Sequence, residues 1–155
     1  MSDKRKGLIL VVVQFVLLFA IVALPHGSQW NVPAWLGTVA LVLMMLGLSI
    51  SLFGIVSLGN SLTATPVPKT DAILRTTGMY ALVRHPIYLG ILLLGLGLTI
   101  PAGSFLTIGA FLLLAATLSY KSRFEEQLLL AKFPDYLAYA TRVGRIIPFV
   151  GKIKN

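Results

Sequence analysis

Two apolar runs near the start of the chain limit what it can fold into more than any other feature. Residues 8–24 contain one polar side chain, Gln14, and residues 34–58 carry no charge. An α-helix needs about 20 such residues to cross the hydrocarbon core of a bilayer. Of the 155 residues, 57% are hydrophobic and only 12% are charged, which leaves too little polar surface for a soluble domain. We therefore expect an all-α integral membrane protein with a single membrane domain over residues 1–155.

Two further apolar segments raise the predicted number of transmembrane helices to four. The predicted spans are residues 8–24, 34–58, 86–100 and 104–120. Pro86 is the expected first residue of the third helix, Pro101-Ala102-Gly103 the expected turn after it, and Ser104 the expected N-cap of the fourth. No proline follows until residue 134, so we expect the fourth helix to continue to about residue 131 as a cytoplasmic extension.

The charged residues predict the orientation of these spans. With four spans, all 13 Lys and Arg residues and all five acidic residues fall on one side of the membrane. The positive-inside rule then places both termini in the cytoplasm. Anionic lipid headgroups account for the net charge of +8, so we expect membrane lipids and no nucleic acid as partners. The chain has no cysteine, which excludes disulfides and thiolate metal sites.

Polar residues gather in two segments of the expected cytoplasmic face, 59–85 and 121–148. Arg84 and His85 precede the third helix, and a cation beside a helix N-terminus can bind a carboxylate or phosphate. Taken alone, such residues are more often anchors at the lipid headgroups. Glu125 can pair with Lys121 four residues earlier, whereas Glu126 has no local partner and is free to bind hydroxyls or an ammonium group.

The order of these signals is more specific than any one of them. The chain contains G-x-Y-x-x-x-R-H-P-x-Y-x-G at 78–90, E-E-x-x-L at 125–129, F-P-x-Y-x-x-Y at 133–139 and R-x-I-P at 145–148. This succession resembles the integral-membrane methyltransferases, which include isoprenylcysteine carboxyl methyltransferases and phospholipid N-methyltransferases. The resemblance covers about residues 58–148. Leu62-Thr63 and Pro66-Val67-Pro68 are similar to the bacterial relatives, which implies a bacterial or archaeal cytoplasmic membrane.

The resemblance implies S-adenosylmethionine as methyl donor, S-adenosylhomocysteine as product, and a lipophilic acceptor that enters from the bilayer. The residues that it places against the cofactor or near it are Tyr80, Arg84, His85, Pro86, Tyr88, Gly95, Gly97, Glu125 and Glu126. The residues that it assigns to catalysis are Lys121, Arg123 and Glu126. Either basic residue would hold the polar head of the acceptor. Some members have more spans, and a homodimer could supply what this chain lacks.

Several alternatives stay open from the sequence. The acceptor is either a carboxylate, which attacks as it is, or an amine, which needs a glutamate or tyrosine as base. Taken alone, Gly95 and Gly97 more often serve helix packing than a ligand. The segment 133–148 could fold back as a lid over the cofactor. From another class of function, the chain could be a non-catalytic membrane protein whose basic cytoplasmic face binds anionic lipid or a partner.

Overall fold

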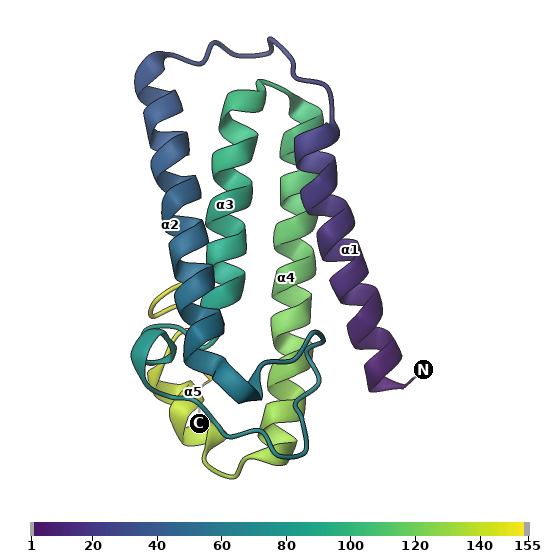
Figure 1. Ribbon diagram of the computed structural model, residues 1–155, viewed down its shortest axis with the longest axis vertical. Coiled ribbons are helices and arrows are strands. Elements are labelled where there is room, and N and C mark those ends of the chain that lie inside the picture. The colour runs from purple at the N-terminus through teal and green to yellow at the C-terminus, as the bar shows by residue number, and fades with distance from the viewer. Residues whose placement is uncertain (1, 154–155) are drawn as a thin grey trace.

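A computed structural model of the chain describes residues 2–153, which form a bundle of long helices with a short helix at one end (Figure 1). The helices are α1 (Asp3–Ala23), α2 (Ala34–Leu58), α3 (Pro86–Ala102), α4 (Phe105–Lys132) and α5 (Tyr136–Arg142). Two 3-10 turns, η1 (Gly59–Ser61) and η2 (Gly78–Ala81), lie in the connection between α2 and α3. No strand occurs among the described residues, so the all-α prediction is confirmed.

Three of the helices, α1, α2 and α4, are long and apolar enough to cross a membrane. The helix α3 is apolar but has 17 residues, and at 1.5 Å per residue it reaches about 26 Å, slightly less than a typical hydrocarbon core. The integral membrane class is thus supported, while the count of four spans and the orientation stay predictions. The 28 residues of α4 extend about 42 Å, so its residues after about 120 project beyond a span.

Helix ends differ from the predictions at three places. The helix α1 begins at Asp3, before the apolar run. The helix α3 continues through Pro101 to Ala102, and Gly103 with φ +58° ends it. A proline in the last turn removes one hydrogen bond, while the glycine supplies the left-handed conformation of a helix stop. Ser104 holds the N-cap position of α4 but its side chain makes no cap; its carbonyl oxygen accepts from Thr107 Oγ1 at 2.7 Å.

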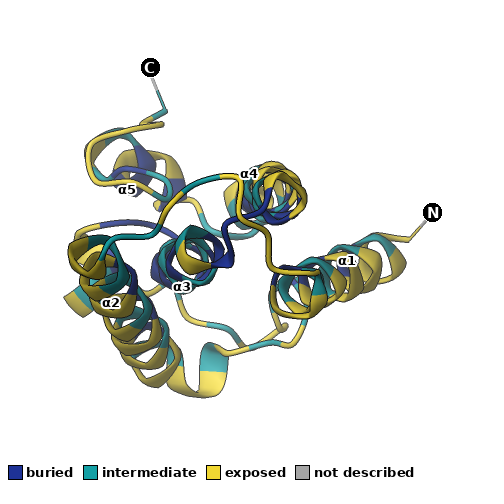
Figure 2. Ribbon diagram, turned by 90° about the horizontal axis from the view of Figure 1, so that it is seen from above, coloured by how far each residue is buried: buried dark blue, intermediate teal, exposed yellow. Residues whose placement is uncertain are grey.

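The long helices form an arc in which α1 packs on α4, α4 on α3, and α3 on α2. Figure 2 shows α1 and α2 at the two ends of this arc, with α3 and α4 between them. Glycines allow α2 and α3 to approach closely, because a Cβ at Gly47 would lie 2.5 Å from the carbonyl oxygen of Gly90. Gly54 likewise faces α3, at Ile87, whereas Gly37 faces open space.

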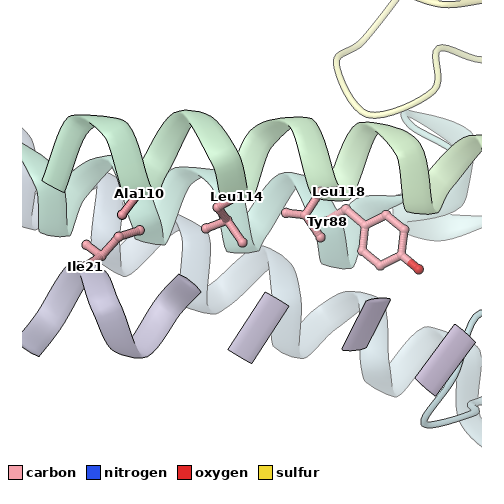
Figure 3. Close-up of a cluster of buried hydrophobic side chains, with 5 residues drawn as sticks. All are labelled: Ile21, Tyr88, Ala110, Leu114 and Leu118. Atoms are coloured by element: carbon pink, nitrogen blue, oxygen red, sulfur yellow. The ribbon is translucent and has the colours of Figure 1, made fainter. Parts of the chain in front are cut away.

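A buried apolar cluster joins α1 to α4 (Figure 3). Its buried members are Ile21, Tyr88, Ala110, Leu114 and Leu118. Tyr88 comes from α3, and its hydroxyl points away from the cluster (Figure 3). The outward faces of the helices expose large apolar side chains such as Phe19 at 72% and Phe53 at 64%, which suits a surface solvated by lipid.

The two ends of the bundle differ in character. The described residues at both ends of the chain lie at the end that carries α5 (Figure 1), and the segments with charged residues lie there too. We call this the polar end. At the opposite end, the loop 24–33 is held against α3 by the Trp30 indole, which donates to the carbonyl oxygen of Ile100 at 3.1 Å.

Candidate active site

The two polar segments singled out in the sequence meet at the polar end of the bundle. Arg84 Nε donates to Glu126 Oε1 at 2.6 Å. One helical turn further along α3, the Tyr88 hydroxyl donates to Glu125 Oε2 at 2.6 Å. Two side-chain hydrogen bonds therefore join the start of α3 to the extension of α4. The donors are Arg84 and Tyr88, and the acceptors are the adjacent residues Glu126 and Glu125.

The guanidinium group of Arg84 is bound by several protein groups and is not free to bind a ligand. Its Nη1 donates to the carbonyl oxygens of Ala140 and Val143, and its Nη2 donates to that of Gly151 at 2.9 Å. Its side chain has no solvent exposure. The expectation that Arg84 offers its charge to a carboxylate or phosphate of a ligand is therefore wrong in this structure, because Glu126 and the C-terminal carbonyls already engage the guanidinium.

The C-terminal segment folds back onto the start of α3. The amides of Arg84 and His85 donate to the carbonyl oxygens of Gly144 and Arg145, each at 2.9 Å. The Tyr139 hydroxyl donates to the carbonyl oxygen of Tyr80. Burial raises the pKa of Tyr139 to about 12, so this phenol remains a donor at neutral pH. The segment thus lies where a lid would close, and its opening stays a prediction.

Glu126 is surrounded by cationic partners from both segments. Its Oε2 accepts from Arg145 Nε at 2.7 Å, in addition to the bond from Arg84 to Oε1. Burial would raise the pKa of Glu126, but His85 and Arg84 outweigh it, and the pKa is lowered from its usual 4.5. Glu126 has no local partner, as predicted; its partners lie 42 and 19 residues away in the chain, where local spacing carries no signal.

The Tyr88 ring lies between the His85 ring and the ammonium group of Lys121. The His85 and Tyr88 rings are parallel with centroids 5.1 Å apart, and Lys121 Nζ lies 4.9 Å from the Tyr88 centroid. Lys121 Nζ donates to Gln14 Oε1 of α1 at 2.7 Å. The expected pair between Lys121 and Glu125 does not form, because each side chain has a partner on another helix, and those partners are buried.

These side chains surround a cavity of about 430 Å³ at the polar end. Its walls come from α1, α2, the connection 61–75, the start of α3, the extension of α4 and the C-terminal segment. The predicted site residues that line it are Tyr80, Arg84, His85, Tyr88, Lys121 and Glu125. A cavity of this size at the junction of several elements suits a small-molecule ligand.

The other predicted site residues lie outside the lining of the cavity. Gly95 packs against Phe111 and Leu114 of α4, and Gly97 against Ala40 and Met44 of α2, so both serve helix packing. Pro86 is buried at the first turn of α3, and Glu126 lies behind the cavity wall. Arg123 is exposed on α4. Of the two basic candidates for holding an acceptor, only Lys121 faces the cavity.

Two residues of the cavity lining each have a buried polar atom with no hydrogen-bond partner among the described residues. These atoms are His85 Nε2 and the Tyr136 hydroxyl. His85 Nε2 is 3.4 Å from Glu126 Oε1, but the alignment falls short of a hydrogen bond. Buried polar atoms are nearly always paired in proteins.

Sequence reasoning missed two of the residues that matter here. Tyr136 belongs to the F-P-x-Y-x-x-Y motif but was not assigned to the site. Gln14 was noted only as an exception within an apolar run. A polar side chain inside a membrane span usually faces the interior of the bundle and has a function, and this was the signal that could have identified Gln14.

Comparison with known proteins gives the family. A family model described as phospholipid methyltransferase matches residues 35–135. The chain belongs to the phospholipid methyltransferase family. A solved structure of the eukaryotic intramembrane Ras methyltransferase ICMT, the isoprenylcysteine carboxyl methyltransferase, is similar with a TM-score of 0.68 and 25% identity, over 99% of this chain and 56% of that one. The family that the sequence motifs resemble is confirmed, and the all-helical fold of the described residues is similar to that of ICMT.

Two curated relatives are similar over nearly the whole chain. The cobalt-zinc-cadmium resistance protein CzcN of Cupriavidus metallidurans is 35% identical over 150 residues, 96% of this chain and 65% of the relative. The nickel-cobalt-cadmium resistance protein NccN of Alcaligenes xylosoxydans is 32% identical over 152 residues, 96% of this chain and 66% of the relative. The chain thus spans slightly less than two thirds of the length of these two relatives.

Proposed function

We propose that this protein transfers a methyl group from S-adenosylmethionine to a lipophilic acceptor at the polar end of the bundle, which we place at the cytoplasmic surface. The observation that carries the proposal is the cavity at the polar end, whose lining brings together His85, Tyr88, Glu125 and Tyr136 of the family motifs. The polar atoms His85 Nε2 and the Tyr136 hydroxyl, which belong to two of these residues, are buried without a hydrogen-bond partner among the described residues.

The residues of the cavity suit the proposed methyl donor. S-adenosylmethionine carries hydroxyls, an amino acid head and an apolar ring, and the lining combines polar atoms with apolar side chains such as Leu74 and Phe133. The parallel rings of His85 and Tyr88 give the cavity a flat wall. His85 and Tyr136 would hold polar atoms of the donor, while Tyr88 and Glu125 fix the position of that wall.

Methyl transfer from a sulfonium depends more on how the donor and the acceptor are positioned than on acid, base or metal groups of the protein. When bound, the donor supplies an electrophilic methyl group on a sulfonium. The residues of the cavity would hold donor and acceptor in line and exclude water, and both effects lower the barrier to a displacement. The extension of α4 and the C-terminal segment line the cavity on the side away from the membrane span. Glu126 accepts hydrogen bonds from Arg84 and Arg145 and so holds these two segments together.

Calorimetric binding of S-adenosylhomocysteine to the detergent-purified protein tests the proposal. Tyr136→Phe removes a hydroxyl that has no partner among the described residues, so the fold should keep its stability while the Kd rises about threefold to tenfold, the effect of one hydrogen bond. His85→Phe keeps a stacking ring, removes both nitrogens, and should weaken binding in the same way.

Tyr120→Phe is the matched control, because its side chain is 51% exposed and outside the cavity lining. It should bind S-adenosylhomocysteine as the wild type does. A folded wild-type protein that binds no S-adenosylhomocysteine in either detergent or lipid would reject the proposed function. The non-catalytic hypothesis, in which the basic residues of the polar end bind anionic lipid or a partner, would then be the better one.

A further inference from the structure

The turn formed by residues 147–150 of the C-terminal segment carries apolar side chains that the protein does not cover. Phe149 is 82% exposed, and Ile147 and Val150 are more than half exposed. None of these three side chains belongs to either apolar cluster of the described residues. Neighbouring exposed apolar side chains of this kind mark a surface that binds a partner or a membrane.

The backbone of the turn holds Phe149 in an unfavourable conformation. The Val150 amide donates to the carbonyl oxygen of Ile147 at 3.1 Å, and Pro148 precedes Phe149, as in a type II turn. Phe149 has a φ of +66° and is the only residue other than glycine with a positive φ among the described residues. Glycine or asparagine normally occupies this position, because a bulky side chain strains the left-handed conformation. A large apolar side chain here indicates a role other than forming the turn.

The turn lies at the depth of the membrane-spanning part of the bundle. The two residues before α3 donate their amides to the carbonyl oxygens of Gly144 and Arg145. The next residue, Ile146, packs against the buried apolar cluster that joins α1 to α4. Figure 3 shows the C-terminal loop, in pale yellow, reaching along the bundle to about the level of Leu118, which belongs to the fourth predicted span.

The surface of α2 at this depth is exposed and apolar. Gly54 of α2 faces Pro86 and Ile87, so this part of α2 lies at the depth of the first turn of α3. On either side of Gly54, the side chains of Phe53 and Val56 are exposed. In a membrane protein, lipid solvates such a surface. The apolar side chains of the turn therefore lie at a depth where lipid surrounds the bundle.

A lysine follows the turn and suits the charge of lipid headgroups. Lys152 is exposed, and its Nζ lies 5.5 Å from the centroid of the Phe149 ring. The nearby guanidinium of Arg145 is bound to Glu126, so Lys152 supplies the accessible positive charge. An aromatic ring at the edge of the hydrocarbon, with a lysine that reaches the phosphates, is typical of an anchor at the membrane interface.

The base of the turn is tied to the residues that hold the cavity together. Arg84 Nη2 donates to the carbonyl oxygen of Gly151 at 2.9 Å, and the Arg145 amide donates to that of Val150 at 2.8 Å. The side chains of the same two arginines bind Glu126. Displacement of the turn would therefore break contacts of both arginines and loosen the C-terminal segment, which lines the cavity.

We propose that residues 147–150 form a membrane anchor, in which Phe149, with Ile147 and Val150, inserts into the bilayer and holds the C-terminal segment against the start of α3. Lys152 binds lipid phosphate at the same place. The partner is the phospholipid bilayer and not a second copy of the chain, because lipid already surrounds the bundle at this depth. The anchor does not depend on methyl transfer, and its tests use no methyl donor.

Spin labels at single cysteines test the depth of the turn, because the chain contains no cysteine. In vesicles of phosphatidylcholine and phosphatidylglycerol, a label on Phe149→Cys should collide more with oxygen, which concentrates in lipid, than with a water-soluble nickel chelate. Val56→Cys on the exposed face of α2 should behave in the same way. Asp135→Cys, at an exposed position of the same C-terminal segment, should show the opposite preference.

Two outcomes of the labelling would overturn the inference. In the first, the label at residue 149 behaves like the label at residue 135, and the turn lies in water. In the second, neither reagent reaches the label at residue 149 and its spectrum shows spin–spin broadening, which means that a second copy of the chain covers the turn.

Hydrogen exchange in the same vesicles tests whether the anchor holds the C-terminal segment. Phe149→Asn removes the apolar ring, and asparagine adopts the left-handed conformation more readily, so the turn should still form. The amides of Arg84 and His85, which donate to this segment, should exchange at least about tenfold faster, since burial of a phenylalanine side chain contributes about this factor. Leu137→Gln, which removes an exposed apolar side chain of α5, is the matched control and should leave both amides unchanged. Unchanged exchange in Phe149→Asn would overturn the holding role.

Discussion

At the residue scale, the contact between Arg84 and Glu126 holds the site together. Both side chains are almost fully buried, so Glu126→Ala would leave a buried guanidinium without its carboxylate. Breaking a buried ion pair in this way costs about 3–5 kcal/mol. We expect this loss in the free energy of unfolding, measured by titration with a denaturing detergent, together with weaker binding of S-adenosylhomocysteine.

The neighbouring Glu125 provides the control. It is about a quarter exposed and accepts one side-chain hydrogen bond, from Tyr88. Its replacement by alanine should cost about 1 kcal/mol. Equal losses for the two alanine variants would contradict a structural role of Glu126. This structural role could not be predicted from the sequence, because the arginine partners of Glu126 are not local.

The same carboxylate predicts acid sensitivity. The pKa of Glu126 is lowered in the folded protein from its usual 4.5, so folding favours the ionised form. This stabilisation is fully present above pH 4.5 and disappears as the pH falls through the folded value. Thermal unfolding should be measured from pH 7 to pH 3. The wild type should have a higher Tm than Glu126→Gln at neutral pH, and this difference in Tm should disappear in the acidic window. A difference in Tm that does not change with pH would argue against the prediction.

At the element scale, the close contact of α2 with α3 depends on individual glycines. A Cβ at Gly47 would lie 2.5 Å from a backbone oxygen of α3, whereas at Gly37 of the same helix it would meet nothing within 4 Å. Gly47→Ala should therefore destabilise the protein by about 1–3 kcal/mol. Gly37→Ala should be neutral or stabilising by up to about 1 kcal/mol, since alanine favours the helix. Similar unfolding free energies for the two variants would refute the close packing.

The sequence predicted elements better than contacts. The bounds of α2 were correct because Pro33 precedes the apolar run, and Gly59 and the polar Asn60 follow it. The helix α5 was not expected, because its seven residues are fixed by tertiary contacts such as the one from Arg84 to the carbonyl of Ala140. The contact between Gln14 and Lys121 was equally hidden, since it depends on α1 packing beside α4, which no spacing in the sequence encodes.

At the scale of the whole molecule, the arc places the charges at one end and leaves the opposite end with short connections (Figure 1). The order of the helices in the arc could not be predicted from the sequence, because apolar helices of similar composition can neighbour one another in several ways. The side of the membrane that each end faces was predicted, since Lys and Arg are retained in the cytoplasm during insertion.

Labelling of single cysteines tests this orientation directly, because the natural chain contains none. Ser2 precedes α1 at the polar end and Ser28 lies in the loop at the opposite end, and both are exposed. In intact bacterial cells, a membrane-impermeant maleimide should label Ser28→Cys and spare Ser2→Cys, which should react only after the membrane is opened. The reverse pattern would put the candidate active site on the external face, where S-adenosylmethionine is not available, and the proposed function would fail with the orientation.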